Sequence, residues 1–258
     1  MRLMKRILSA AAVLALSASL LVGCSSGTAS SVPVSASSAA ESTVSSVEET
    51  ASSAVDENEA AAAQLLNDLT GSYQELWPVI LADEYKQTWL DDCTALVGED
   101  NAEAAFEKLS SMVTGDVYGE DAVKAYANGG GAYFCGFTNS LAILTFEGET
   151  STISGTDKDG NVLFSHTYHY IGMEPVRGLY EFESDDADSG EFTYFFLAPD
   201  TSAETYHIEF RYGSDAEALS QYDAGEYAYW LASGISTDCD QTMIDNCIEL
   251  FCTENLAG

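Results

Sequence analysis

Two neighbouring side chains in the second half of the chain have the chemistry of metal ligands. His207 and Glu209 lie in the segment Phe192 to Gly213, which reads FTYFFLAPDTSAETYHIEFRYG. Side chains alternate between the two faces of a β-strand, so a strand from Thr205 to Tyr212 would place His207 and Glu209 on one face. An imidazole and a carboxylate are both zinc ligands. We therefore predict a divalent metal site that contains His207 and Glu209.

The other two of the three histidines, His166 and His169, lie in the β-prone run Phe164 to Tyr170. Their spacing of three places them on opposite faces of a regular strand, so at most one can join His207. Two interpretations stay open: one of them completes the site, or both are half-exposed strand residues. A hard cation such as calcium is the alternative ion because the chain has a surplus of carboxylates.

Sequence patterns of known catalytic sites are missing. The chain has no GxSxG, no HExxH and no Walker-type phosphate loop. It contains 42 acidic and 9 basic residues, so pairs of carboxylates are too frequent to indicate an acid and base couple. We predict that the protein is not an enzyme.

The first residues have the features of an export signal. Basic residues precede the apolar run Ile7 to Val22. The run ends in Leu21-Val22-Gly23-Cys24, which resembles the bacterial lipobox; this resemblance implies cleavage before Cys24 and a thioether-linked lipid on its sulfur. We expect residues 1–23 to be a lipoprotein signal peptide and the mature chain to be anchored to the extracytoplasmic face of a bacterial cell membrane. The alternative is an ordinary secreted protein in which this cysteine occurs by chance.

Residues 24–59 are rich in Ser, Ala, Val, Thr and Glu and contain no aromatic residue. Such a composition cannot form a hydrophobic core, so we predict a disordered tether before a folded part at 60–258. The formal net charge is −33, and loss of three basic residues with the signal peptide makes it about −36. Nucleic acid and anionic lipid are poor partners for such a charge.

The folded part contains helical patterns, then β-prone runs, then a final helix. Helices are expected at 59–69, at 101–112 with Asp100 or Asn101 as the N-cap, and at 240–254. The β-prone runs are 132–137, 141–147, 150–155, 162–170, 179–183 and the two arms of the hairpin 192–212. Asp157-Lys158-Asp159-Gly160 is typical of a hairpin turn. The order predicts an α+β, mainly β fold: an antiparallel barrel or sandwich with flanking helices.

Several short motifs in this order resemble the ZinT-type domain of bacterial zinc-binding proteins. They are GSYQELWPVI, DKDGNVL, VRGLYEFE, LAP followed by YHIEFRYG, and WLASGI. The resemblance implies a calycin-like, or lipocalin-like, β-barrel that binds zinc outside the cytoplasm or assists zinc uptake by an importer or its binding protein.

Carried over position by position, the family's three metal-binding histidines fall on Phe195, His207 and Glu209. Phe195 cannot coordinate a metal, so the resemblance implies a degenerate site. The alternative function is metal-independent binding of an apolar small molecule, or of a cell-surface protein partner, through the aromatic interior or rim of the barrel.

Five cysteines follow Cys24, and disulfides are expected in an exported protein. We expect Cys239 or Cys247 to join the terminal segment to Cys93 or Cys135. Buried free thiols are the alternative. Trp77 belongs to a stripe of apolar residues at helical spacing, which is typical of core packing rather than of a ligand site.

Overall fold

The structure is a computed structural model, and it describes residues 57–198 and 207–257. The signal peptide, Cys24, the tether up to residue 56 and the turn that contains Pro199 lie outside the described residues. The expectations for these segments therefore stay predictions.

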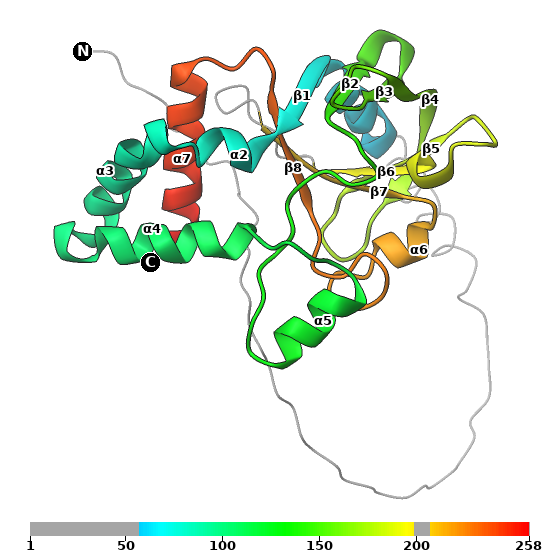
Figure 1. Ribbon diagram of the computed structural model, residues 1–258. Helices are drawn as coiled ribbons and strands as arrows, with labels where there is room; N and C mark the ends of the chain where they lie inside the picture. The colour runs from blue at the N-terminus through cyan, green and yellow to red at the C-terminus, as the bar shows by residue number, and fades with distance from the viewer. Residues whose placement is uncertain (1–56, 199–206, 258) are drawn as a thin grey trace, which may run out of the picture. The chain divides into compact units, whose positions relative to one another are not determined.

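Eight antiparallel strands form a closed barrel, in which each strand pairs with its neighbours in the chain and β1 also pairs with β8 (Figure 1). The strands are β1 (Gly71–Glu75), β2 (Ile143–Glu147), β3 (Thr152–Thr156), β4 (Val162–Met173), β5 (Tyr180–Ser184), β6 (Tyr194–Leu197), β7 (His207–Gly213) and β8 (Ala232–Ser236). The predicted fold class, an antiparallel barrel with flanking helices, is confirmed.

The barrel interior is filled by the side chains that point inward from its strands. A barrel of eight strands is just wide enough for its own side chains to fill it. The fully buried rings and aliphatic groups include Leu144, Phe146, Ile153, Phe182, Phe195, Phe210 and Tyr212. Residues 57–68 form a helix whose apolar face packs against this core through Ala62, Leu65 and Leu66.

A group of helices packs beside the barrel and has a core of its own (Figure 1). It consists of α2 (Leu76–Ile80), α3 (Lys86–Val97), α4 (Glu99–Val113) and α7 (Gln241–Leu256), and we call it the helical layer. Two further helices are α5 (Glu120–Ala127) and α6 (Ala216–Leu219). In the described ranges, no helix is both long and apolar enough to cross a lipid bilayer.

Two helix caps illustrate how far local sequence determined the boundaries. Asp240 caps α7 and accepts a hydrogen bond from Met243 N at 3.0 Å, as its side-chain chemistry predicts. The expected start of α4 at Asp100 or Asn101 is wrong, because the helix begins at Glu99. Gly98 separates α3 from α4 at a φ of +85°, a conformation that glycine adopts without steric cost, and this brings the start of α4 forward.

The strands differ from the expected pattern at the places where the barrel closes. β1 and β8 were not predicted, since neither has a strong alternation of apolar residues. The expected strand at 132–137 is instead a segment outside the barrel. Its Phe134 makes two isolated bridges, one to Thr114 and one to Trp230. Cys135 O accepts a hydrogen bond from Ser233 N on β8 at 3.0 Å, so the backbone of this segment lies along the edge of that strand.

Candidate functional site

The predicted metal ligands lie side by side on the outer face of β7. The residues that alternate with them along the strand point into the barrel core. On the neighbouring strand, His207 is paired with Ile235 and Glu209 with Ser233. Ile235 packs into the helical layer, and both predicted ligands are half buried. The alternation therefore predicted that the two share a face, and the barrel makes that face the outer one.

Phe195 lies on the opposite face of the sheet. It pairs with Tyr212 across β6 and β7, and its fully buried ring is 5.4 Å from the rings of Tyr168 and Tyr212, centroid to centroid. The three positions that align with the family's histidines are thus divided between the interior and the exterior of the barrel. Phe195 and the pair His207 and Glu209 cannot contribute to one site.

His166 and His169 lie on opposite faces of β4, as their spacing predicts. His166 shares the inward face with Phe164, and its Nδ1 is 2.8 Å from Asp186 Oδ2. His169 is exposed, and its Nδ1 is 2.8 Å from Asp185 Oδ1. Each imidazole therefore pairs with one carboxylate at the surface.

No three His, Cys, Asp or Glu side chains within residues 57–198 and 207–257 are close enough together to hold a metal ion. A structural zinc site needs four ligands, and a catalytic one needs three from the protein. The described residues around His207 and Glu209 do not fit such a zinc site. The metal site that contains these two residues stays a prediction.

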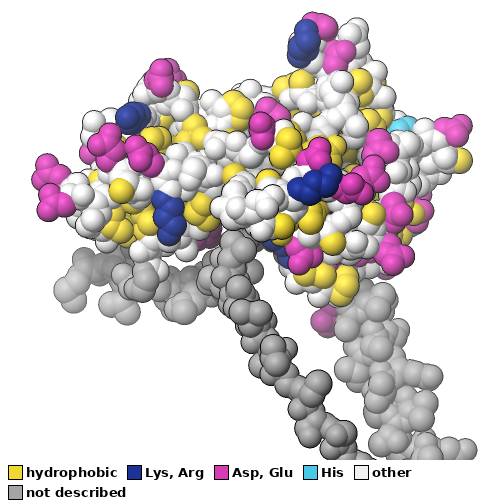
Figure 2. Space-filling model, turned by 60° about the horizontal axis from the view of Figure 1, so that its bottom comes forward, with side chains coloured by type: hydrophobic (Ala, Val, Ile, Leu, Met, Phe, Trp, Pro, Cys, Tyr) yellow, Lys and Arg dark blue, Asp and Glu magenta, His cyan; other side chains and the backbone are white. Residues whose placement is uncertain are grey.

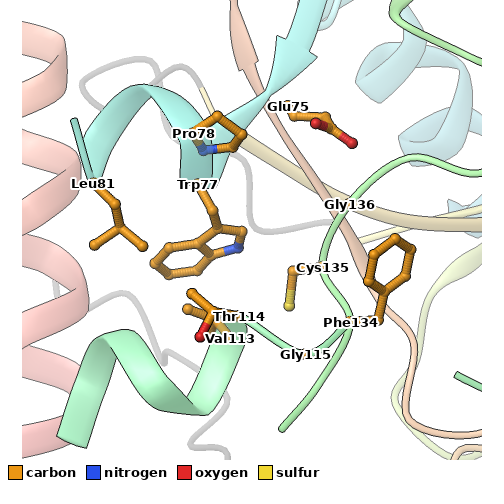
Figure 3. A pocket seen from close by; sticks show the side chains of 10 residues that line it. All are labelled: Glu75, Trp77, Pro78, Leu81, Val113, Thr114, Gly115, Phe134, Cys135 and Gly136. Atoms are coloured by element: carbon orange, nitrogen blue, oxygen red, sulfur yellow. The ribbon is translucent and has the colours of Figure 1, made fainter. Parts of the chain in front are cut away.

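A pocket of about 330 Å³ lies where the helical layer meets the outside of the barrel (Figure 3). Its volume is at the lower end of the range for small-molecule sites. The end of β1, helix α2, residues 113–115 and residues 134–136 enclose it. The apolar part of its lining consists of Trp77, Pro78, Leu81, Val113 and Phe134.

Two polar groups in this pocket could select a ligand. Trp77 Nε1 is buried and donates to no oxygen or nitrogen atom in the part of the chain that the structure describes; it faces the sulfur of Cys135, a weak acceptor, and lowers the pKa of that thiol. Figure 3 shows this nitrogen on the side of the indole that faces Cys135. A buried N–H group without a strong acceptor costs free energy, so an acceptor atom on a ligand would stabilise the pocket. The second group is the carboxylate of Glu75, which also lines the pocket.

The backbone beside Glu75 holds its carboxylate in place. Glu75 Oε1 accepts a hydrogen bond from Phe137 N at 2.6 Å. A Cβ atom at Gly136 would lie only 2.9 Å from the same oxygen, so glycine permits this close approach. The last residue of β1 therefore presents an acidic group at a defined position next to an apolar lining.

Cys135 is the one thiol among the lining residues of the pocket, and its surroundings suppress its reactivity. Burial, and then the negative charge of Glu209, raise the pKa of Cys135 to about 12, against smaller opposing contributions from Ser233, Trp77 and Arg177. The thiolate is the reactive form of cysteine, so a thiol with this pKa is a poor nucleophile at neutral pH. In the same way, burial and Glu209 raise the pKa of Cys247 to about 12. Neither thiol is therefore activated for covalent chemistry.

Sequence reasoning assigned Trp77 to a core and did not identify Glu75 or Cys135 as site residues. Trp77 does pack into the core of the helical layer, so the prediction of core packing is confirmed. Its ring also lines the pocket. No local pattern could have revealed this, because the pocket is assembled from segments that are distant in the chain.

Comparison with known proteins found no matching family model and no matching curated protein. Among solved structures, the chain is similar to the Zn(II)-bound ZinT-like domain of Streptococcus pneumoniae AdcA. The two share 15% identity over 70% of this chain and 87% of that domain, with a TM-score of 0.44. The Zn(II)-bound AdcA from Streptococcus pneumoniae is similar at 13% identity and a TM-score of 0.42 over 71% of this chain. This chain covers 34% of the length of that AdcA chain.

Proposed function

We propose that the protein is a lipid-anchored, extracytoplasmic binding protein of a bacterial cell, and that its folded part binds a small molecule without chemical conversion. The observation that carries this proposal is the lining of the pocket, in which the aromatic side chains of Trp77 and Phe134 lie beside the carboxylate of Glu75. The anchor would be the lipid on Cys24. The barrel interior is a poor alternative because it is filled by buried side chains.

The lining favours a small organic cation with an apolar body. Trp77 and Phe134 offer aromatic surface, and Glu75 supplies the acidic group next to it. Aromatic faces attract cations, and a charge-assisted hydrogen bond to a carboxylate is stronger than a neutral one. The overall charge acts in the same direction, since acidic side chains are spread over the visible face and basic ones are few (Figure 2).

Three probes that share a phenethyl group but carry a positive, a neutral or a negative polar group test the charge preference of the pocket. Phenethylamine, phenethyl alcohol and 3-phenylpropionate are titrated calorimetrically into the full-length protein. We expect the amine to bind at least about tenfold more tightly than the carboxylate, which corresponds to about 1.4 kcal/mol. Equal affinities, or no binding of any probe, would contradict the proposal.

The matched variants are Glu75→Gln and Glu107→Gln. Both remove one negative charge, but Glu107 is exposed on α4 and is not part of the pocket lining. Glutamine at 75 keeps an oxygen that can accept the hydrogen bond from Phe137 N. We expect Glu75→Gln to abolish the preference for the amine and Glu107→Gln to preserve it.

The metal hypothesis for His207 and Glu209 is a second proposal, favoured by their common position on the outer face of β7. Zinc is the implied ion, and a metal importer or its binding protein is the implied partner. Chelator-stripped protein is titrated with zinc, copper, manganese and calcium during thermal unfolding. A stoichiometric rise in Tm with zinc that is lost in His207→Ala supports the proposal. No shift with any ion would contradict it.

A further inference from the structure

Two buried thiols from opposite ends of the folded part meet inside the helical layer. Cys93 lies on α3 and Cys252 on α7, 159 residues apart, and their Sγ atoms are 3.9 Å from each other. Both side chains have no exposed surface. The helices around them are in close contact, and Trp89 of α3 packs against Phe251 of α7 with ring centroids 6.0 Å apart.

The expected partners of the terminal helix were different. Sequence reasoning joined Cys239 or Cys247 to Cys93 or Cys135, whereas the structure brings Cys252 to Cys93. All five cysteines of the described part are free thiols in this structure. The buried stripe of α7 contains both Cys247 and Cys252, and only the packing of α3 against α7 decides which thiol meets Cys93.

We propose that Cys93 and Cys252 form a disulfide bond in the exported protein and that this bond ties α3 to α7. The contact of 3.9 Å must shorten to about 2.05 Å, the length of an S–S bond. This inference is independent of which ligand the pocket binds. It requires only the oxidising environment that export past the membrane provides.

The bond forms by thiol–disulfide exchange with an external disulfide, such as that of an extracytoplasmic oxidoreductase. One cysteine thiolate attacks the external disulfide, which forms a mixed disulfide and releases one thiolate. The second cysteine thiolate then attacks the mixed disulfide and releases the other. The two cysteines are oxidised by two electrons, the external disulfide is reduced to two thiols, and those thiols take up the two protons that the cysteines lose.

The folded structure also indicates when this exchange takes place. Burial raises the pKa of both thiols, so the thiolate form is scarce once the helices have packed. The external disulfide also cannot reach a pair without exposed surface. We therefore expect the disulfide to form during folding, before α7 packs against α3. Once the helices have packed, the bond is buried and protected from reductants.

The test is peptide mapping of the full-length exported protein, extracted in detergent and unfolded in the presence of excess N-ethylmaleimide, so that any free thiol is alkylated as soon as it becomes exposed. Cleavage after glutamate places Cys93 alone on residues 85–99 and Cys252 alone on residues 250–254. We expect to find these two peptides linked to each other, with a mass that is two hydrogen atoms less than the sum of the masses of the two reduced peptides. Recovery of both peptides as N-ethylmaleimide adducts, or of either peptide joined to another cysteine, would overturn the proposal.

Thermal unfolding with and without a reductant that acts on the unfolding protein provides the second measurement. We expect reductant to lower the Tm of the wild type by several degrees, because the bond restricts the unfolded chain over a long loop. It should have no effect on Cys93→Ala or Cys252→Ala. Cys247→Ala, a buried thiol on the same helix, is the matched control and should keep the reductant effect. A Tm of the wild type that does not respond to reductant would count against the bond.

Discussion

The barrel interior is filled with aromatic rings, whereas the core of the helical layer beside it combines two tryptophans with small and aliphatic side chains, and a pocket lies where this layer meets the barrel. The first core contains rings from nearly every strand, including Phe146, Phe182 and Phe210. The second contains four cysteines and two alanines. The barrel therefore uses its inner volume for its own stability, and the pocket lies outside it, against β1 and α2. Four predictions test this division.

The largest effect is expected at the centre of the barrel. Phe195→Ala removes a fully buried ring that contacts several other rings, and should lower the free energy of unfolding by about 3–5 kcal/mol. Urea unfolding at pH 7 measures it. Val176→Ala is the control, since this side chain is 65% exposed and should change stability by less than about 0.5 kcal/mol. A similar loss in both variants would mean that the interior is not tightly packed.

A smaller loss is expected when the hydrogen bonds of one buried hydroxyl of the barrel are removed. The hydroxyl of Tyr212 donates to Thr138 O at 2.9 Å and accepts from Thr138 N at 2.6 Å. Tyr212→Phe keeps the ring but leaves both backbone groups without this partner, which should cost about 1–3 kcal/mol. Urea unfolding again gives the value. An unchanged free energy of unfolding would show that water replaces the hydroxyl and that this end of the barrel is open.

Two buried tryptophans of the helical layer allow a controlled test of the pocket, because Trp77 lines it and Trp89 does not. Trp89 Nε1 donates to Ile80 O at 2.7 Å, whereas Trp77 Nε1 faces the Cys135 sulfur and donates to no oxygen or nitrogen atom among the described residues. Both Trp→Phe changes remove similar volume, but only Trp89→Phe removes a hydrogen bond to a carbonyl oxygen. We expect Trp89→Phe to be more destabilising than Trp77→Phe by about 1–2 kcal/mol.

The variants Trp77→Phe and Trp89→Phe also distinguish an effect on stability from an effect on ligand binding. Trp77→Phe should weaken binding of phenethyl alcohol, which supplies an acceptor oxygen, and Trp89→Phe should leave that affinity unchanged. Equal losses of stability in the two variants would indicate that Trp77 Nε1 is already satisfied, and would rule it out as a donor to a bound ligand.

The smallest effect concerns the charge between α3 and α7. Burial, and then the charges of Glu249, Asp245 and Asp91, raise the pKa of Asp92 above its ordinary value of 3.8. The folded state therefore binds this proton more tightly than the unfolded state. Ionised Asp92 destabilises the fold at neutral pH, and this cost disappears as the pH falls through the raised pKa towards 3.8.

Asp92→Asn should therefore raise the free energy of unfolding at pH 7, by less than about 1 kcal/mol because solvent screens a partly exposed group. The gain should shrink as the pH approaches 4. Urea unfolding between pH 4 and pH 7 tests both statements. Glu107→Gln, which removes an exposed charge on α4, should show no comparable pH-dependent gain. A loss of stability in Asp92→Asn at pH 7 would mean that the carboxylate has a favourable partner.

The elements that sequence reasoning predicted best are those with a strong local signal. Between β3 and β4, Asp157 Oδ1 accepts hydrogen bonds from Asp159 N and Asn161 N, both at 2.9 Å, and Gly160 adopts a φ of +81°. This is the hairpin turn that the sequence predicted. β1 and β8 were missed because their pairing with each other depends on closure of the whole barrel, and no short segment carries that information.

Sequence alone determined which residues share a face. Alternation places His207 and Glu209 together on β7. Tertiary structure decided what each face meets. Closure turned the two predicted ligands outward and Phe195 inward, and helix packing brought Cys252 to Cys93 and joined Glu75 and Trp77 to the segment of Cys135. The physical reason is that periodicity acts over a few residues, whereas the partner of a face is set by contacts between segments far apart in the chain.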